Sequence, residues 1–138
     1  MANLTQTAAN VHVDGSASEC KFELVQCGEA ITAGEPVYQL SSDSKYYAAQ
    51  ADTSVKAAAR GIAMTSAALD GYAFVVFSGP VDVGATVAIG VVYYVSNTNG
   101  AICLESDLGT GHFVTKLGIG VTASQIRVGI SATGIQKA

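Results

Sequence analysis

The sequence predicts a mainly β fold, in the form of one compact β-barrel or β-sandwich-like domain. Three observations predict it: many short stretches alternate apolar with polar residues, turn-forming residues separate these stretches, and helical signals are few. The 138 residues fit one domain. A chain of this length buries about two-thirds of its unfolded surface, which supports a hydrophobic core without metal or disulfide cross-links.

The expected strands follow one another along most of the chain. They cover residues 21–27, 37–40, 46–48, 61–64, 72–77, 91–95, 101–104, 112–121 and 126–131. Clusters of Ser, Asn, Asp and Gly separate them, as in residues 41–44, 78–80, 97–100 and 109–111. Short strands with such regular turns are typical of barrels and sandwiches rather than of alternating strand–helix folds.

One or two short helical turns are also expected. Asp52 is the predicted N-cap of a helix over residues 55–59, with Gly61 ending it. Residues 65–71 are the second candidate. Helices of this length are marginal without packing, so they do not change the fold class.

An internal pseudo-repeat is indicated by two matched pairs of segments. Residues 37–41 (VYQLS) resemble residues 92–96 (VYYVS), and residues 61–65 (GIAMT) resemble residues 118–122 (GIGVT). An apolar strand follows in each half, so the order is kept. The alternative is a chance match among Gly, Val and Ile. A true repeat predicts one barrel built from two similar halves, since neither half could bury its apolar face alone.

Residues 1–20 are expected to form a flexible N-terminal arm, and residues 21–138 the single β-rich domain. The first eighteen residues contain no aromatic side chain and so bury too little area to order themselves. Val11, His12 and Val13 nevertheless alternate like a short strand, which could add to a sheet edge of another protein. The expected contact residues are Leu4, Val11, His12 and Val13; the alternative is a disordered tail without contacts.

Charged residues are scarce, at 13% of the chain, and the formal net charge is −4. A negative field repels phosphate, so nucleic acid is not an expected partner. Charge is also depleted at the cores of subunit interfaces, although a well-solvated uncharged surface gives the same composition. The apolar stretch over residues 71–103 is interrupted by Gly, Pro and Asp, which indicates buried strands and no membrane span.

No catalytic constellation is predicted. The nearest candidate is a nucleophile pair of Cys103 and His112, oriented by Asp107, across a turn. Cys103 lies in an apolar run, however, where a packed thiol is the usual state. No phosphate-binding glycine loop is present in the sequence, and the two Tyr-Tyr doublets lack the basic neighbours of a nucleic-acid platform. One tyrosine of each doublet should face the core.

No metal or cofactor site is predicted either. Cys20, Cys27 and Cys103 form an odd set without a CxxC pair, so they are expected to be free and reduced. His12 and His112 are far apart and show no metal-ligand spacing.

Four segments taken in order resemble a known family. They are residues 28–38 (GEAITAGEPVY), 59–65 (ARGIAMT), 70–73 (DGYA) and 117–134 (LGIGVTASQIRVGISATG). Together they resemble the small capsid cement, or head decoration, proteins of tailed bacteriophages, over residues 25–138. The motifs consist largely of Gly, Ala, Ile and Val, so the resemblance rests on the order of the four segments and on the length of chain that they cover.

The resemblance implies a β-rich domain that is added to the outside of an assembled capsid. It implies the major capsid protein as partner, often with a homotrimer as the unit that binds. It also implies a virion location after synthesis in the bacterial cytoplasm, and no catalysis or cofactor. Neither a membrane nor a small-molecule substrate is an expected partner. Two alternatives stay open: a phage tail or fibre domain, and a small β-barrel enzyme or ligand carrier that uses Cys103 and His112.

Overall fold

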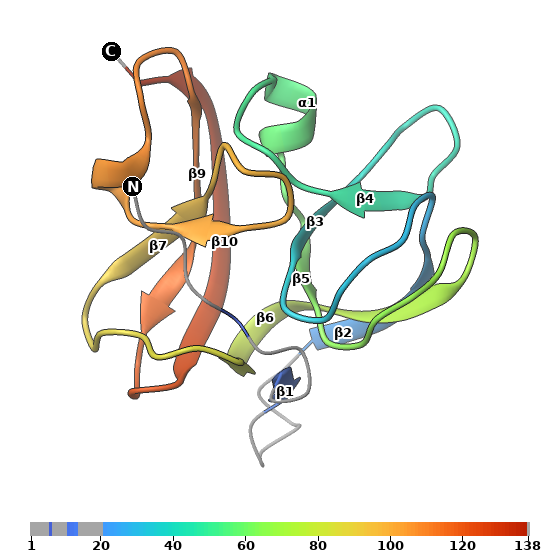
Figure 1. Cartoon of the computed structure of the whole chain (residues 1–138), viewed down its shortest axis with the longest axis horizontal. Helices are drawn as coiled ribbons and strands as arrows, with labels where there is room; N and C mark the ends of the chain where they lie inside the picture. The colour runs from blue at the N-terminus through green and yellow to red at the C-terminus, as the bar shows by residue number, and fades with distance from the viewer. Residues whose placement is uncertain (1–5, 7–10, 14–20, 138) are drawn as a thin grey trace.

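The structure is a computed structural model that describes residues 6, 11–13 and 21–137, with the backbone alone for residues 12 and 13. Ten strands in this part form one antiparallel sheet, which curls into a half-barrel (Figure 1). The strand order is β4-β3-β5-β6-β10-β9-β7-β8, and both β1 and β2 pair with β6. The predicted mainly β fold is confirmed.

The bounds of the elements agree with most of the predicted strands. The strands are β1 (Val11–Val13), β2 (Lys21–Gln26), β3 (Pro36–Gln39), β4 (Tyr46–Ala48), β5 (Gly61–Ala63), β6 (Tyr72–Val83), β7 (Val92–Val95), β8 (Ile102–Cys103), β9 (Phe113–Gly120) and β10 (Gln125–Gln136). The helical elements are α1 (Ser54–Ala57) and the 3-10 turn η3 (Glu105–Asp107). The largest differences from prediction are in β6 and β10, which are both twelve residues long.

Strand β6 is shared by both halves of the sheet. Along one edge it pairs with β2 over residues 72–78 and with β1 over residues 81–83. Along the other edge it pairs with β5 and then with β10. The turn predicted at residues 78–80 is wrong, because the strand continues through Gly79 at a φ of 110°. Pro80 lies between the stretches that pair with β1 and β2, where an interrupted ladder accommodates a proline.

The strand order repeats from one half to the other, as the pseudo-repeat predicts. The halves are β4-β3-β5-β6 and β8-β7-β9-β10, joined where β6 meets β10. Each half also contains a short helical element at the same place in its order: α1 comes directly before β5, and η3 comes directly before β9. Tyr38 and Tyr93, which the sequence match aligns, are both buried in the large core cluster.

Buried apolar residues lie on both faces of β6. Val76 belongs to a large core cluster that extends into both halves, and the neighbouring Val75 belongs to a smaller cluster within the first half. Both valines are fully buried. Because successive side chains of a strand point to opposite faces, β6 has core on each side at this point.

The helical elements differ from the prediction. The N-cap of α1 is Thr53 and not Asp52, because the Thr53 hydroxyl accepts a hydrogen bond of 3.2 Å from Lys56 N. Asp52 instead lies 3.8 Å from Lys56 Nζ as an ion pair. Residues 65–71 contain no helix; Ile31 and Ala67 exchange two backbone hydrogen bonds there. The turn η3 was not predicted.

Two glycines at matching places of the repeat allow close approach of neighbouring strands. A Cβ at Gly61 would collide with the carbonyl oxygen of Val76, and one at Gly118 with the carbonyl oxygen of Arg127. Neither glycine has a positive φ. Glycine is therefore required at these two positions because the next strand lies too close for a side chain, and not because the backbone has a positive φ.

We expect Gly118→Ala and Gly61→Ala each to lower the free energy of unfolding by about 1–3 kcal/mol, because the added methyl forces adjacent strands apart. Gly129→Ala in β10 is the control, since a Cβ there meets nothing within 4 Å. Denaturant unfolding measures all three variants. Equal stability of Gly118→Ala and Gly129→Ala would contradict the close-approach argument.

Candidate binding surface

Large apolar side chains lie exposed on the outer face of the β2–β6 pair. They are Phe22 (49% exposed), Leu24 (56%), Tyr72 (60%) and Phe74 (43%), and we call them the β2–β6 apolar face. Strand alternation places these four side chains on one side of the pair. Ala73 and Val75, which alternate with Tyr72 and Phe74 along β6, point to the other side and are fully buried. Val76, which follows Phe74 on the same side of β6, is fully buried, so the exposed face ends there. Figure 1 shows where β2 and β6 lie in the sheet.

The strand register makes this face continuous. Leu24 lies opposite Phe74, and the rings of Phe22 and Phe74 pack edge to face with centroids 6.0 Å apart. An open apolar hollow of about 200 Å³ adjoins them, lined by Phe22, Met64, Thr65, Phe74 and Val76. The Thr65 hydroxyl accepts a 3.0 Å hydrogen bond from Phe74 N, which fixes the rim of the hollow. Contiguous exposed apolar surface of this kind marks interaction sites.

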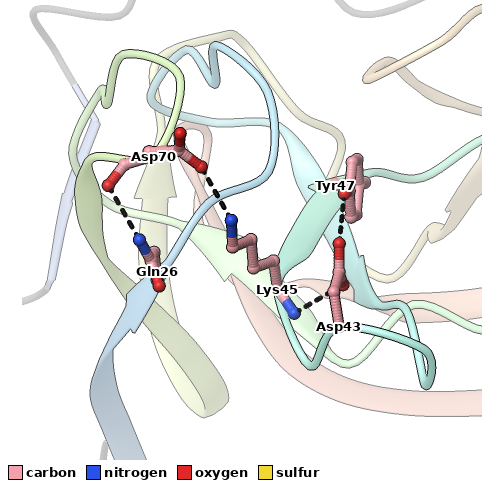
Figure 2. A network of polar contacts seen from close by, with 5 residues as sticks. All are labelled: Gln26, Asp43, Lys45, Tyr47 and Asp70. Atoms are coloured by element: carbon pink, nitrogen blue, oxygen red, sulfur yellow. Dashed lines mark hydrogen bonds and ion pairs between the residues drawn. The ribbon is translucent and has the colours of Figure 1, made fainter.

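A polar network lies at the end of this face, next to Gln26 and Tyr72 (Figure 2). Gln26 Nε2 donates to the carbonyl oxygen of Asp70 at 3.1 Å, and Lys45 Nζ donates to Asp70 Oδ1 at 2.8 Å. Asp43 then accepts from the backbone of Lys45 at 2.9 Å and from the Tyr47 hydroxyl at 2.6 Å. The network joins β2, the loop before β6 and the β3–β4 turn on the exposed surface.

The Asp43–Tyr47 hydrogen bond changes the acidity of both groups. The bond from Tyr47 is the main cause that lowers the pKa of Asp43, and the same bond raises the pKa of Tyr47 to about 12. Both shifts favour the ionised carboxylate next to the protonated phenol. The pair therefore stabilises the fold between the acidic range in which Asp43 protonates and the alkaline range in which Tyr47 ionises.

A second, polar hollow of about 310 Å³ lies over β3 and β4. Its lining residues are Glu29, Tyr38, Tyr47, Ala48, Gln50, Lys56 and Asn99. Glu29 Oε2 accepts a 2.8 Å hydrogen bond from Ala48 N, and the rings of Tyr38 and Tyr47 are 5.9 Å apart. The tyrosine doublets behave as predicted: Tyr46 and Tyr93 are buried, and their neighbours are half-buried.

Cys103 and His112, the candidate nucleophile pair, form hydrogen bonds with different backbone groups. Cys103 is 1% exposed, and its thiol donates weakly to the Val95 carbonyl oxygen at 3.9 Å. Burial is the main cause that raises the pKa of Cys103 to about 11, so the thiol is protonated at neutral pH. His112 Nδ1 accepts a 2.9 Å hydrogen bond from Gly109 N. This arrangement does not supply a thiolate nucleophile.

The expected contact residues of the arm lie partly outside the described residues. Leu4 lies outside them, and of His12 only the backbone is described, within β1. Val11 is buried, and β1 pairs with the last residues of β6. Gln6 Nε2 donates to Val83 O and to a second carbonyl, at 2.9 Å each. These described positions thus contact the chain's own sheet, and their contact with another protein stays a prediction.

The described residues contain no group of three His, Cys, Asp or Glu side chains placed to hold a metal ion. Within that same part, no helix has the length and apolar character needed to cross a membrane. Comparison of the chain with protein-family models, with curated proteins and with solved structures finds no match. The fold and the surface chemistry are therefore the grounds for a functional proposal.

We expect Asp43→Asn to lower the pKa of Tyr47 toward the ordinary value of about 10, because an amide no longer favours the protonated phenol. Ultraviolet titration of tyrosine ionisation measures this change, with Tyr47→Phe identifying the signal. Asp52→Asn is the matched control, since it removes a carboxylate that does not bond to Tyr47. An unchanged titration in Asp43→Asn would show that the hydrogen bond is not responsible.

We expect the buried thiols of Cys27 and Cys103 to resist alkylation by iodoacetamide at neutral pH until the protein unfolds. Burial raises the pKa of both groups, so the thiolate fraction is small. Intact-mass measurement over time, in a Cys20→Ser background, follows these two residues. Rapid labelling of Cys103 in the folded protein would contradict this result and favour the enzyme alternative.

Proposed function

We propose that this chain is a structural virion protein that binds the outer surface of an assembled phage head and reinforces it. The partner would be the major capsid protein, and the location the capsid exterior. The order of the segments that resemble head decoration proteins supports the proposal, as does the scarcity of charge. The observation that carries it is the exposed β2–β6 apolar face.

The form of this surface suits docking to another protein. It is a flank of two strands with a shallow hollow, and its aromatic rings are already packed against each other. Burying one such side chain contributes about 1.5–3 kcal/mol. The scarcity of charge also means that few ionised groups would lose water on docking. These properties favour a stable association over the transient binding of a small substrate.

Two alternatives predict different observations. A tail or fibre domain would use the same kind of apolar face, but it would be found with tails and show an elongated assembly in solution. An enzyme or carrier based on Cys103 and His112 would need a reactive thiolate, and the burial and raised pKa of Cys103 speak against one.

Co-sedimentation with purified phage heads that contain the major capsid protein tests the proposal. We expect the full-length protein to bind saturably, and Leu24→Ser and Phe74→Ser to weaken binding by about tenfold or more, from the apolar area lost. Ile135→Ser, an exposed apolar residue of β10, is the matched control and should bind normally. All variants should keep a cooperative melting transition. Equal binding by wild type and both face variants, or no binding at all, would contradict the proposal.

A further inference from the structure

The polar hollow over β3 and β4 is built by both halves of the repeat. Its lining comes from the first half, except for Asn99, which lies in the β7–β8 turn of the second. Two backbone hydrogen bonds hold that turn against the first half: Ala51 N donates to Ser96 O at 3.0 Å, and Gly100 N donates to Ala49 O at 2.8 Å. The walls are therefore formed without a ligand, and the volume of about 310 Å³ is in the range of small-ligand sites.

Tyr47 gives the hollow an aromatic wall whose orientation is fixed. Its ring lies directly over Gly28, where a Cβ would collide with it, and its hydroxyl donates to Asp43 (Figure 2). The ring of Tyr38 lies 5.9 Å away, at an angle of 30°. A ring that is already held in one orientation loses little side-chain entropy when an apolar ligand face packs against it.

Polar groups of the lining have hydrogen-bonding capacity to spare. Glu29 Oε2 accepts from Ala48 N at 2.8 Å, and Gln50 Nε2 donates to Asn97 O at 2.8 Å. Within the described residues, the side chains of Glu29 and Gln50 make no other hydrogen bond, and that of Asn99 makes none. Two side chains are thus held at one end, and each leaves an oxygen available as an acceptor.

The charges of the hollow disfavour both an anionic and a cationic ligand. Glu29 and Lys56 are the charged residues of its lining, so their formal charges cancel. Lys56 Nζ lies 3.8 Å from Asp52 Oδ2, which is longer than a hydrogen bond, so the ammonium keeps its donors. Burial is the main cause that raises the pKa of Tyr38, and the charges of Glu29, Asp52 and Asp43 add to it. An anion would meet this negative field, and a cation would meet Lys56.

We propose that the polar hollow binds one uncharged sugar ring. A pyranose has hydroxyl groups around its rim, each of them a donor and an acceptor, and C–H groups on its faces. The rim matches the available groups of Glu29, Gln50, Lys56 and Asn99, and a C–H face matches the ring of Tyr47. Hydrogen bonds to the two charged side chains would be the strongest. A free monosaccharide and the last unit of a glycan present the same chemistry, and a methyl glycoside separates them because its anomeric oxygen is blocked.

NMR titration of the isotope-labelled full chain tests the proposal, with D-glucose, D-galactose, N-acetyl-D-glucosamine and their methyl glycosides as probes. We expect at least one sugar to shift the amide signals of Ala48 and Gln50 saturably. The expected dissociation constant is about 1–10 mM, as for a ligand of about twelve to fifteen non-hydrogen atoms. Sodium phosphate and choline chloride are the control ligands and should bind more weakly. A methyl glycoside that binds as well as its free sugar identifies the end of a glycan as the ligand.

Glu29→Gln and Asn99→Ala should each raise the dissociation constant about threefold or more, since each removes a hydrogen-bonding group from the hollow. A glutamine at position 29 can still accept from Ala48 N, so this variant keeps the local fold. The matched controls are Glu23→Gln in β2 and Thr98→Ala next to Asn99. Both control residues are exposed and neither lines the hollow, so these variants should bind as the wild type does.

Three results would overturn the proposal. One is the absence of a saturable shift with any sugar probe, up to about ten times the expected dissociation constant. Another is binding of phosphate or choline that equals or exceeds that of every sugar. The third is that Glu29→Gln and Asn99→Ala bind like their controls, with melting curves showing that all variants are folded. The proposal does not rest on head binding: loss of sugar binding would leave co-sedimentation with heads intact, and the reverse also holds.

Discussion

The fold depends on the pairing of β6 along both of its edges. A central strand satisfies its backbone donors and acceptors only if partners are present on each side. Here the partners change midway: β2 and β5 flank the first part, and β1 and β10 flank the second. The pairing of β6 with β10 therefore joins the two halves of the repeat into one sheet. The large core cluster, which includes Val76, Val81 and Val83 of β6, extends into both halves.

The change of partners along β6 also creates the binding surface. Near its end the strand is almost wholly buried, with Val81 and Val83 in the main core. At its start the exposed Tyr72 and Phe74 alternate with the buried Ala73 and Val75, and the neighbouring β2 is a terminal strand of the described sheet. The β2–β6 apolar face therefore lies where β6 pairs with this terminal strand.

Much of the fold could be predicted from local sequence, and the failures share a cause. The stretches that became β2, β4 and β5 were predicted because alternation and β-branched residues act locally. Residues 78–80 have turn chemistry, yet pairing on both edges of β6 overrides it. Asp52 and Thr53 are equally suitable caps by residue type, and only the backbone path of the chain selects Thr53.

The surface was missed for a related reason. Alternation in residues 21–26 predicts a strand and shows which side chains share a face. Whether a face is covered depends on the neighbours in the sheet, which the local pattern does not contain. One local signal was present: Ala73 lies between the large Tyr72 and Phe74, and a small residue suits the crowded side of a strand.

Among the described strands β2 pairs with β6 alone, which raises the question of how its other edge avoids indiscriminate pairing. Charged residues on an edge strand, lysine above all, oppose the addition of apolar strands because the charge would lose water without compensation. A lysine and a glutamate two residues apart keep this protection against most partners.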